Sequence, residues 1–147
     1  DFVTMDIGSL YNGYRSDMTR TVAVKMADER QRYIYNVVKR SQEEGVKAVR
    51  AGVECKLIDK AARDVIISEG VEGMFEYGIG HGVGLEIHEA PAMSPNSTHI
   101  LEAGNVITVE PGIYIPGWGG VRIEDMVAVT KDGCEILTRS PKELIIV

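Results

Sequence analysis

Residues 106–112 read Val-Ile-Thr-Val-Glu-Pro-Gly and place one carboxylate, that of Glu110, in a strongly apolar, β-prone run. A buried glutamate is rare, because a charged group in a core must be paired or bound to a metal to offset its lost hydration. A salt bridge to Arg122 or a partly exposed edge strand would explain Glu110 without any functional site. This stretch on its own leaves both explanations open.

Four further blocks place an ionisable side chain among apolar residues and glycines, and each looks like a core strand or a tight turn. Four carboxylates and one imidazole in such surroundings need a shared cation. One divalent ion would be over-supplied by four negative ligands, so two ions fit the set better. The candidate metal ligands are Asp6, Asp17, His81, Glu110 and Glu124.

Most of these candidates also have an explanation that involves no metal. Asp6 and Asp17 could each cap a turn. Arg122 and Glu124 are two residues apart on one strand face, with Asp125 pointing the other way, and could form a surface ion pair. Taken singly, these residues decide nothing.

Glycines surround His81 and allow other groups to approach its backbone closely. A phosphate-binding loop is the rival interpretation, but residues 78–83 break the G-x-G-x-x-G spacing and no G-K-[ST] follows, so nucleotide binding is discounted. His88 comes seven residues later, so the two histidines do not form an H-E-x-x-H motif. We expect His99, in a polar loop, to lie on the surface.

The composition is typical of one soluble globular domain over residues 1–147. A net charge of −6 argues against nucleic-acid binding, and no apolar run approaches the ~20 residues of a membrane span. Cys55 and Cys134 show neither metal-type spacing nor a disulfide framework, and no signal peptide is visible, so a cytoplasmic location is expected. Because the chain opens on a strand-like run, we expect a fragment that begins inside a domain.

The first third of the chain predicts a hairpin and the start of a helical pair. Residues 2–7 and 17–25 resemble two strands, and the two-residue period of a hairpin would aim Asp6 and Asp17 at one point. Asp28 and Gln31 form a capping-box signature. The predicted helices cover residues 29–51, stopping before Gly52, and residues 57–69, stopping before Gly70.

The rest of the chain predicts strands and loops. Residues 85–88 alternate like a short strand, and residues 91–104 look like a loop rich in proline and polar residues. Asp132 and Gly133 form a good hairpin turn. Strands are expected at 105–110, 113–115, 121–130 and 134–138.

Six blocks occur in the order and spacing of one enzyme family. They are Asp-Ile-Gly at 6–8, Gly-Tyr-Arg-Ser-Asp-Met-Thr-Arg-Thr at 13–21, Gly-His-Gly-Val-Gly-Leu at 80–85, His-Glu-Ala-Pro at 88–91, Val-Glu-Pro-Gly-Ile-Tyr at 109–114 and Gly-Val-Arg-Ile-Glu-Asp at 120–125. The set resembles the pita-bread (M24-type) metallopeptidases, in particular the Xaa-Pro dipeptidase and Xaa-Pro aminopeptidase branch. The resemblance implies an α+β fold with a curved, mostly antiparallel sheet, helices on one face, and the N-terminal part of the catalytic domain absent.

The resemblance also implies roles for individual residues. Asp6, Asp17, His81, Glu110 and Glu124 would be the five protein ligands of a dinuclear site that holds Mn, Co, Zn or Fe. A metal-bridged hydroxide would attack the peptide carbonyl, with Glu110 as proton shuttle and His88 stabilising the oxyanion. Arg122 would orient a ligand carboxylate, and Tyr114 would support the same site.

The expected activity is therefore hydrolysis of the bond between an N-terminal residue and proline, with a peptide or dipeptide as substrate and a homodimer as the full-length form. Two alternatives stay open. One is an enzyme similar to methionine aminopeptidase, although those enzymes differ around these blocks. The other is a peptidase-like binding module that holds a peptide without turnover.

Overall fold

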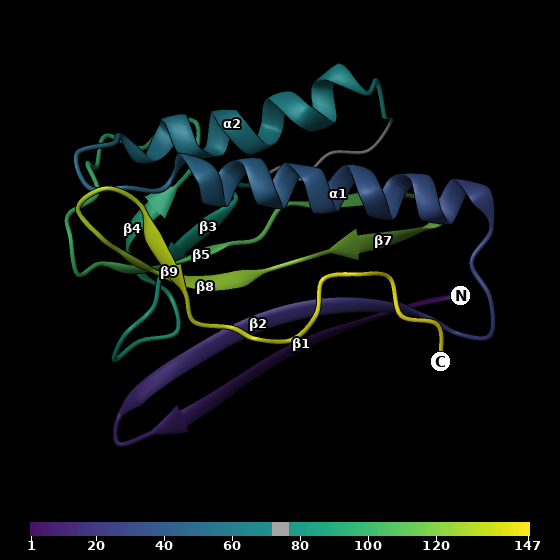
Figure 1. Ribbon diagram of the computed structural model, residues 1–147, viewed down its shortest axis with the longest axis horizontal. Coiled ribbons are helices and arrows are strands. Elements are labelled where there is room, and N and C mark those ends of the chain that lie inside the picture. Colours follow the sequence, from purple (N-terminus) through teal and green to yellow (C-terminus); the bar gives the residue numbers. More distant parts are fainter. Residues whose placement is uncertain (72–76) are drawn as a thin grey trace.

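The computed structural model describes residues 1–71 and 77–147 and arranges them in layers (Figure 1). The helices α1 and α2 lie together on one side of the molecule, the short strands β3–β9 lie beneath them, and the long β1–β2 hairpin lies on the side away from the helices. All pairings between named strands are antiparallel. The expected mixed, mostly antiparallel α+β architecture is confirmed.

The hairpin consists of β1 (Phe2–Tyr11) and β2 (Tyr14–Ala23), joined by the two residues Asn12 and Gly13. Both have positive φ, 51° and 87°, as a tight two-residue hairpin turn requires. The strands are longer than the sequence predicted, because the chain turns only at these two residues. Asp6 therefore lies within a strand, and the idea that it caps a turn is wrong.

The helices are close to their predicted positions. α1 (Glu29–Ala48) begins with the predicted capping box, in which the Asp28 carboxylate accepts from the Gln31 N–H and the Gln31 side chain accepts from the Asp28 N–H. It ends three residues before 51, because Val49 is already extended. α2 (Cys55–Ser68) begins two residues earlier than predicted.

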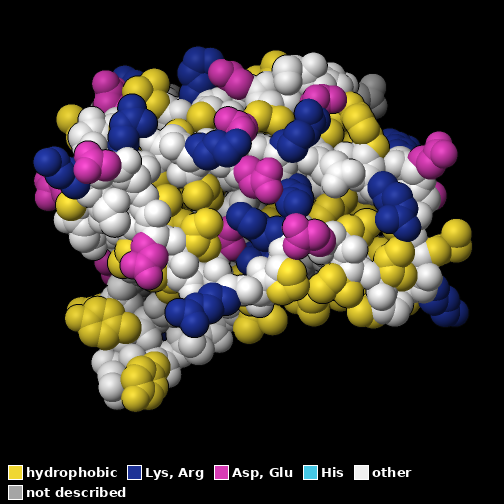
Figure 2. Space-filling model, viewed as in Figure 1, with side chains coloured by type: hydrophobic (Ala, Val, Ile, Leu, Met, Phe, Trp, Pro, Cys, Tyr) yellow, Lys and Arg dark blue, Asp and Glu magenta, His cyan; other side chains and the backbone are white. Residues whose placement is uncertain are grey.

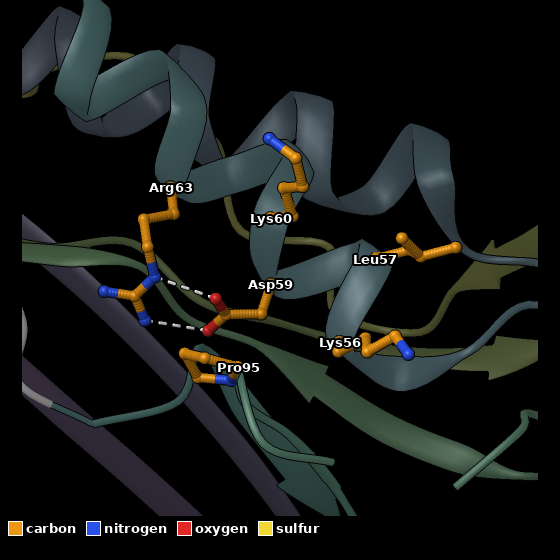
Figure 3. Close-up of a pocket in the computed structure, with 6 residues that line it drawn as sticks. All are labelled: Lys56, Leu57, Asp59, Lys60, Arg63 and Pro95. Carbon is orange, nitrogen blue, oxygen red and sulfur yellow. Dashed lines mark hydrogen bonds and ion pairs between the residues drawn. The ribbon is translucent and has the colours of Figure 1, made fainter. Parts of the chain in front are cut away.

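On α2, the buried Asp59 is held by its neighbour Arg63. The Arg63 guanidinium donates to both carboxylate oxygens, at 2.8 and 2.9 Å. Figure 3 shows this ion pair beside a cavity of about 270 Å³ that Pro95 closes on one side. None of the candidate metal ligands lines that cavity, so the pair belongs to the helical layer.

The central sheet has the order β4-β3-β5-β8-β9. Its strands are β3 (Gly80–Gly82), β4 (Glu89–Met93), β5 (Val106–Val109), β8 (Asp125–Val129) and β9 (Cys134–Ile136). The strand predicted at 85–88 is wrong: those residues bend, and the strand begins at Glu89, inside the segment that looked like a loop. Pro91 argued against a strand there, but β4 is an edge strand, where proline is tolerated.

A separate hairpin, β6 (Gly112–Ile115) and β7 (Gly119–Arg122), corrects another prediction. Residues 121–130 were expected to form one strand, but the chain leaves β7 after Arg122 and joins the central sheet only at Asp125. Glu124 lies in the break, and its N–H donates to the Thr19 carbonyl at 3.1 Å. The break allows one segment to take part in two sheets, and at the break Glu124 is bonded to β2 of the β1–β2 hairpin.

The apolar core lies between the helices and the central sheet. Val37, Val38, Ile58 and Ile66 of the helices and Ile107 of β5 are fully buried. Among the described residues, no helix is long and apolar enough to cross a membrane. Figure 2 shows hydrophobic side chains on the projecting end of the β1–β2 hairpin, where Leu10, Tyr11 and Tyr14 are exposed.

Candidate metal centre

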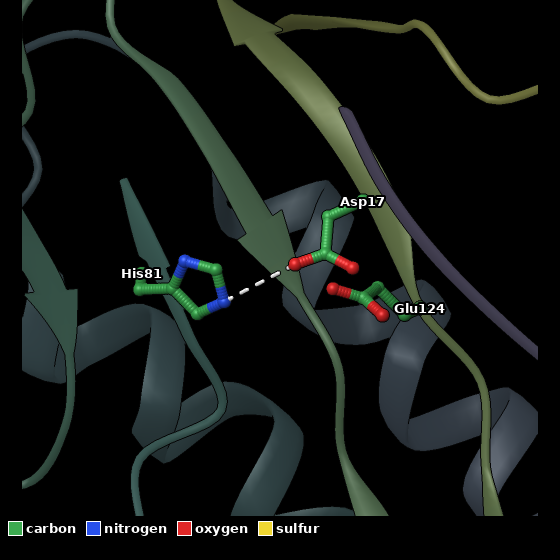
Figure 4. A group of neighbouring side chains, drawn as sticks. All are labelled: Asp17, His81 and Glu124. Carbon is green, nitrogen blue, oxygen red and sulfur yellow. Dashed lines mark ion pairs between the residues drawn. The ribbon is translucent and has the colours of Figure 1, made fainter. Parts of the chain in front are cut away.

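Asp17, His81 and Glu124 converge on one point (Figure 4). Each offers one ligand atom, and these atoms all lie within 4.8 Å of one another. The residues come from β2, from β3 and from the break before β8, so three segments distant in sequence meet here. The donor set of two carboxylates and one imidazole suits a divalent first-row metal ion.

Glycines place His81. A Cβ on Gly80 would lie 2.0 Å from the Thr108 carbonyl oxygen, and a Cβ on Gly82 would lie 2.3 Å from that of Ala90. Only glycine allows both neighbouring strands to approach this closely. The His81 Nδ1 lies 2.9 Å from the Gly82 carbonyl oxygen, which makes Nδ1 the donor and turns Nε2 toward the carboxylates, where it could bind a cation.

Glu110 lies beside His81. One carboxylate oxygen is 3.1 Å from His81 Nε2 and accepts a hydrogen bond from the Thr108 hydroxyl at 3.0 Å. The other oxygen is 3.8 Å from Arg122 Nε. The salt bridge to Arg122 considered for Glu110 is therefore present, and it lies within the candidate site.

Asp6 shares a face with Asp17, because Asp6 pairs with Thr19 across the hairpin and Gly8 pairs with Asp17. Its side chain is more exposed and meets Arg122, whose Nη2 lies 2.5 Å from an Asp6 oxygen. The structure thus places Asp6 next to the convergent group, with its carboxylate held toward Arg122.

Arg122 connects several of these groups. It donates to the Tyr114 hydroxyl at 2.7 Å and to the Thr19 hydroxyl at 3.1 Å, in addition to meeting Asp6. Glu124 is only 1% exposed, so the alternative of a surface ion pair with Arg122 is wrong. Arg122 and Tyr114 lie around the acidic group in a position to orient its carboxylates.

The electrostatics of the site favour a cation. Burial, followed by the negative charge of Glu110, raises the pKa of Glu124 to about 8. Burial, followed by the charges of Asp6 and Glu110, also raises the pKa of Asp17. Glu124 Oε1 is buried and has no hydrogen-bond partner among the described residues. A buried oxygen without a donor, in a group of carboxylates that repel one another, fits a bound metal ion.

The histidines differ in their surroundings. Burial opposes protonation of His81, but the hydrogen bond to Glu110 and the nearby carboxylates outweigh it and raise the pKa. The His88 ring lies edge-on to His81, with 4.2 Å between ring centroids, and is exposed at the side of the acidic group. His99 is exposed, as the sequence predicted.

Two threonines were missed by the sequence analysis. Thr19 donates to Glu124 at 2.7 Å, and Thr108 donates to Glu110 while it accepts from the His81 N–H at 3.0 Å. Each lies two residues from a candidate ligand: Thr19 from Asp17 within β2, and Thr108 of β5 from Glu110, just beyond the end of that strand. In extended chain this spacing puts the two side chains on the same side. That spacing was the available signal.

Comparison with known proteins points to one family. The sequence profile of metallopeptidase family M24 matches residues 1–131. The chain is 48% identical over 145 residues to a Xaa-Pro dipeptidase of Pyrococcus furiosus, a match that covers 99% of this chain and 42% of that protein.

Solved structures of Xaa-Pro peptidases also match this chain. A Xaa-Pro dipeptidase from Bacillus anthracis matches with a TM-score of 0.97 and 51% identity, covering 99% of this chain and 41% of that one. An X-Pro aminopeptidase from Thermotoga maritima matches with a TM-score of 0.96 and 39% identity over the same shares. The expected pita-bread fold is confirmed, and the chain spans about two fifths of the length of these relatives.

Proposed function

Because the chain belongs to metallopeptidase family M24, we propose that it forms the metal-binding part of an enzyme that hydrolyses the peptide bond between an N-terminal residue and proline. The observation that carries the proposal is the convergence of Asp17, His81 and Glu124, with one buried Glu124 oxygen that has no hydrogen-bond partner within residues 1–71 and 77–147. The names of the relatives support the Xaa-Pro specificity over that of a methionine aminopeptidase.

We propose Asp6, Asp17, His81, Glu110 and Glu124 as the ligands of two divalent cations. Two further observations support Glu110 and Asp6 as ligands beside the convergent three. Glu110 contacts His81, and Asp6 shares a face of the hairpin with Asp17. Oxygen donors with one imidazole suit Mn, Co, Zn or Fe, and we propose manganese first because hard oxygen ligands dominate. Two divalent cations would carry four positive charges, which balance the charges of the four carboxylates.

When bound, the two cations would lower the pKa of the attacking water and polarise the peptide carbonyl. The chain's own residues do the rest. Glu110 moves the proton between the nucleophile and the leaving amine, and its carboxylate is already aligned by Thr108. His88, exposed beside His81, donates to the oxyanion that forms on the substrate.

Arg122 and Tyr114 hold the acidic group in place. Their mutual hydrogen bond and the contact of Arg122 with Asp6 restrict the position of that exposed carboxylate. A bidentate or forked guanidinium contact fixes geometry as well as charge. Arg122 is therefore proposed as an orienting residue, with Tyr114 as its support.

The relatives include both a dipeptidase and an aminopeptidase, so both substrate lengths belong to the proposal. A homodimeric full-length form and a cytoplasmic location are also parts of it. The two cysteines are free, which suits a reducing compartment.

The test measures metal content and turnover of Xaa-Pro dipeptides and longer Xaa-Pro peptides by the full-length protein. Wild type should bind manganese or cobalt and cleave at proline, and Asp17→Asn and Glu110→Gln should each lose metal or turnover. Unchanged metal content and unchanged turnover in both variants would contradict the assignment. Metal binding with no hydrolysis by the wild type would favour the non-catalytic binding module instead.

A further inference from the structure

Arg20 lies on the face of β2 opposite the candidate ligands and is almost completely buried, with 7% exposure. Its guanidinium donates in three directions. One nitrogen donates to the backbone carbonyls of Thr19 and Glu124. The others donate to the Asp125 carboxylate, at 2.7 Å, and to the carbonyls of Ser140 and Pro141 in the C-terminal segment. One side chain thus joins three separate segments.

The contact with Glu124 matters because the backbone there belongs to no strand. β7 has ended at Arg122 and β8 begins at Asp125, so no sheet ladder positions the residue between them. Its N–H donates to the Thr19 carbonyl and its own carbonyl accepts from Arg20. Both of its backbone hydrogen bonds therefore go to β2, the strand that carries Asp17.

The partner carboxylate fixes the guanidinium in turn. Asp125 is fully buried and accepts from Arg20 and Thr138 on one oxygen and from Gln42 and Lys142 on the other. With every side of the carboxylate occupied, Arg20 has one orientation. A lysine could carry the charge but has no planar fork to reach all three segments.

We propose that Arg20 is a positioning residue for the metal centre, because its guanidinium locks the Glu124 backbone to β2 and so sets the separation between the Glu124 and Asp17 carboxylates. This inference rests on the proposed metal site. It concerns a residue that touches no ligand atom and acts through the main chain. Groups that orient metal ligands typically change metal affinity by about 10–100-fold when removed.

The test is Arg20→Lys in the full-length protein, with Mn²⁺ affinity measured by calorimetry and the visible absorption of bound Co²⁺ measured as a report on ligand geometry. We expect the variant to bind Mn²⁺ about 10–100-fold more weakly and to show a shifted Co²⁺ spectrum. Arg63→Lys is the matched control, because Arg63 also pairs with a buried aspartate, Asp59, but on α2 (Figure 3). It should lower thermal stability without changing either metal readout.

Arg20→Lys with wild-type Mn²⁺ affinity and an unchanged Co²⁺ spectrum would overturn the inference, whatever its thermal stability. If Arg20→Lys does not fold, Asp125→Asn decides by the same two readouts, since it removes the charge that orients the guanidinium and keeps the side-chain shape. Unchanged metal binding in that variant would overturn the inference equally. Failure of the wild type to bind metal is a different outcome, because it would refute the proposed metal site itself.

Discussion

Glu124 and Asp125 are adjacent carboxylates, both almost fully buried, yet their surroundings are opposite. Asp125 is surrounded by the donors Arg20, Thr138, Gln42 and Lys142. Glu124 faces other carboxylates and receives one hydrogen bond from Thr19, and its second oxygen has no hydrogen-bond partner in the described part of the chain. One carboxylate is satisfied by the protein, whereas the other is arranged for something the protein must bind.

The pKa values express the same difference. Burial alone would raise the pKa of Asp125, but hydrogen bonds from Lys142, Thr138 and Arg20 outweigh it and hold the pKa below its ordinary value. Burial and the nearby charge of Glu110 together raise the pKa of Glu124 to about 8. Burial of a carboxylate therefore does not distinguish a structural role from a functional one, whereas the number of hydrogen-bond donors around it does.

Asp125→Ala should have the largest effect. It would leave Arg20 and Lys142 buried without their shared partner, and removing one side of a buried ion pair costs about 3–5 kcal/mol of unfolding free energy. Urea denaturation measures this loss. Glu135→Ala, at an exposed position of β9, is the control and should change stability by less than about 0.5 kcal/mol. A small loss for Asp125→Ala would contradict the structural role given to its cluster.

Glu124→Gln should weaken metal binding and spare stability, the reverse of Asp125→Ala. Removing a ligand should weaken Mn²⁺ binding by more than about 100-fold, beyond the usual effect of an outer residue. The metal-free protein should keep or gain stability, because glutamine does not have to bear a buried charge. Calorimetric metal titration and urea denaturation check the two halves. Retained metal binding together with a large stability loss would place Glu124 in the same structural class as Asp125.

His88→Ala alters the edge of the site and touches neither buried carboxylate. Metal content should stay at the wild-type level, while kcat for an Xaa-Pro dipeptide should fall by about 10²–10³-fold, the usual effect of losing one oxyanion donor. His99→Ala, at an exposed position outside the site, should change neither quantity. Loss of metal on His88→Ala would make His88 a ligand and would enlarge the acidic site.

The pH dependence should separate the two carboxylates by sign. Because the pKa of Glu124 is raised, the metal-free protein should lose stability as pH rises from about 4.5 to about 8, and metal affinity should rise over the same range as the carboxyl group gives up its proton. Because the pKa of Asp125 is lowered, its contribution is present above 3.8 and is lost as pH falls through its folded pKa.

In the metal-free protein, Glu124→Gln should remove the loss of stability between about pH 4.5 and about 8. The loss of stability at acidic pH, which comes from Asp125, should remain. Urea denaturation across this pH range is the measurement. If the variant still loses stability as pH rises over this range, another group with a raised pKa, such as Asp17, must be responsible.

Local patterns determined much of this protein before any contact was known. The capping box at Asp28 and the alternation around Asp17 need only a few neighbouring residues, and they predicted a helix and a hairpin close to those observed. The order of the six motif blocks predicted the family and the residues of the candidate site. These features depend on near-neighbour chemistry, which the sequence contains directly.

Other features depend on contacts between distant segments. The break at Glu124 exists because its backbone bonds to β2 across the fold, and the strand at Glu89 exists because it is an edge where Pro91 costs no ladder bond. The identity of the carboxylates in apolar surroundings can be read from the sequence. Which of the two neighbouring carboxylates receives Arg20 depends on the tertiary structure, because the guanidinium and the Asp125 side chain are more than a hundred residues apart and must meet in the fold.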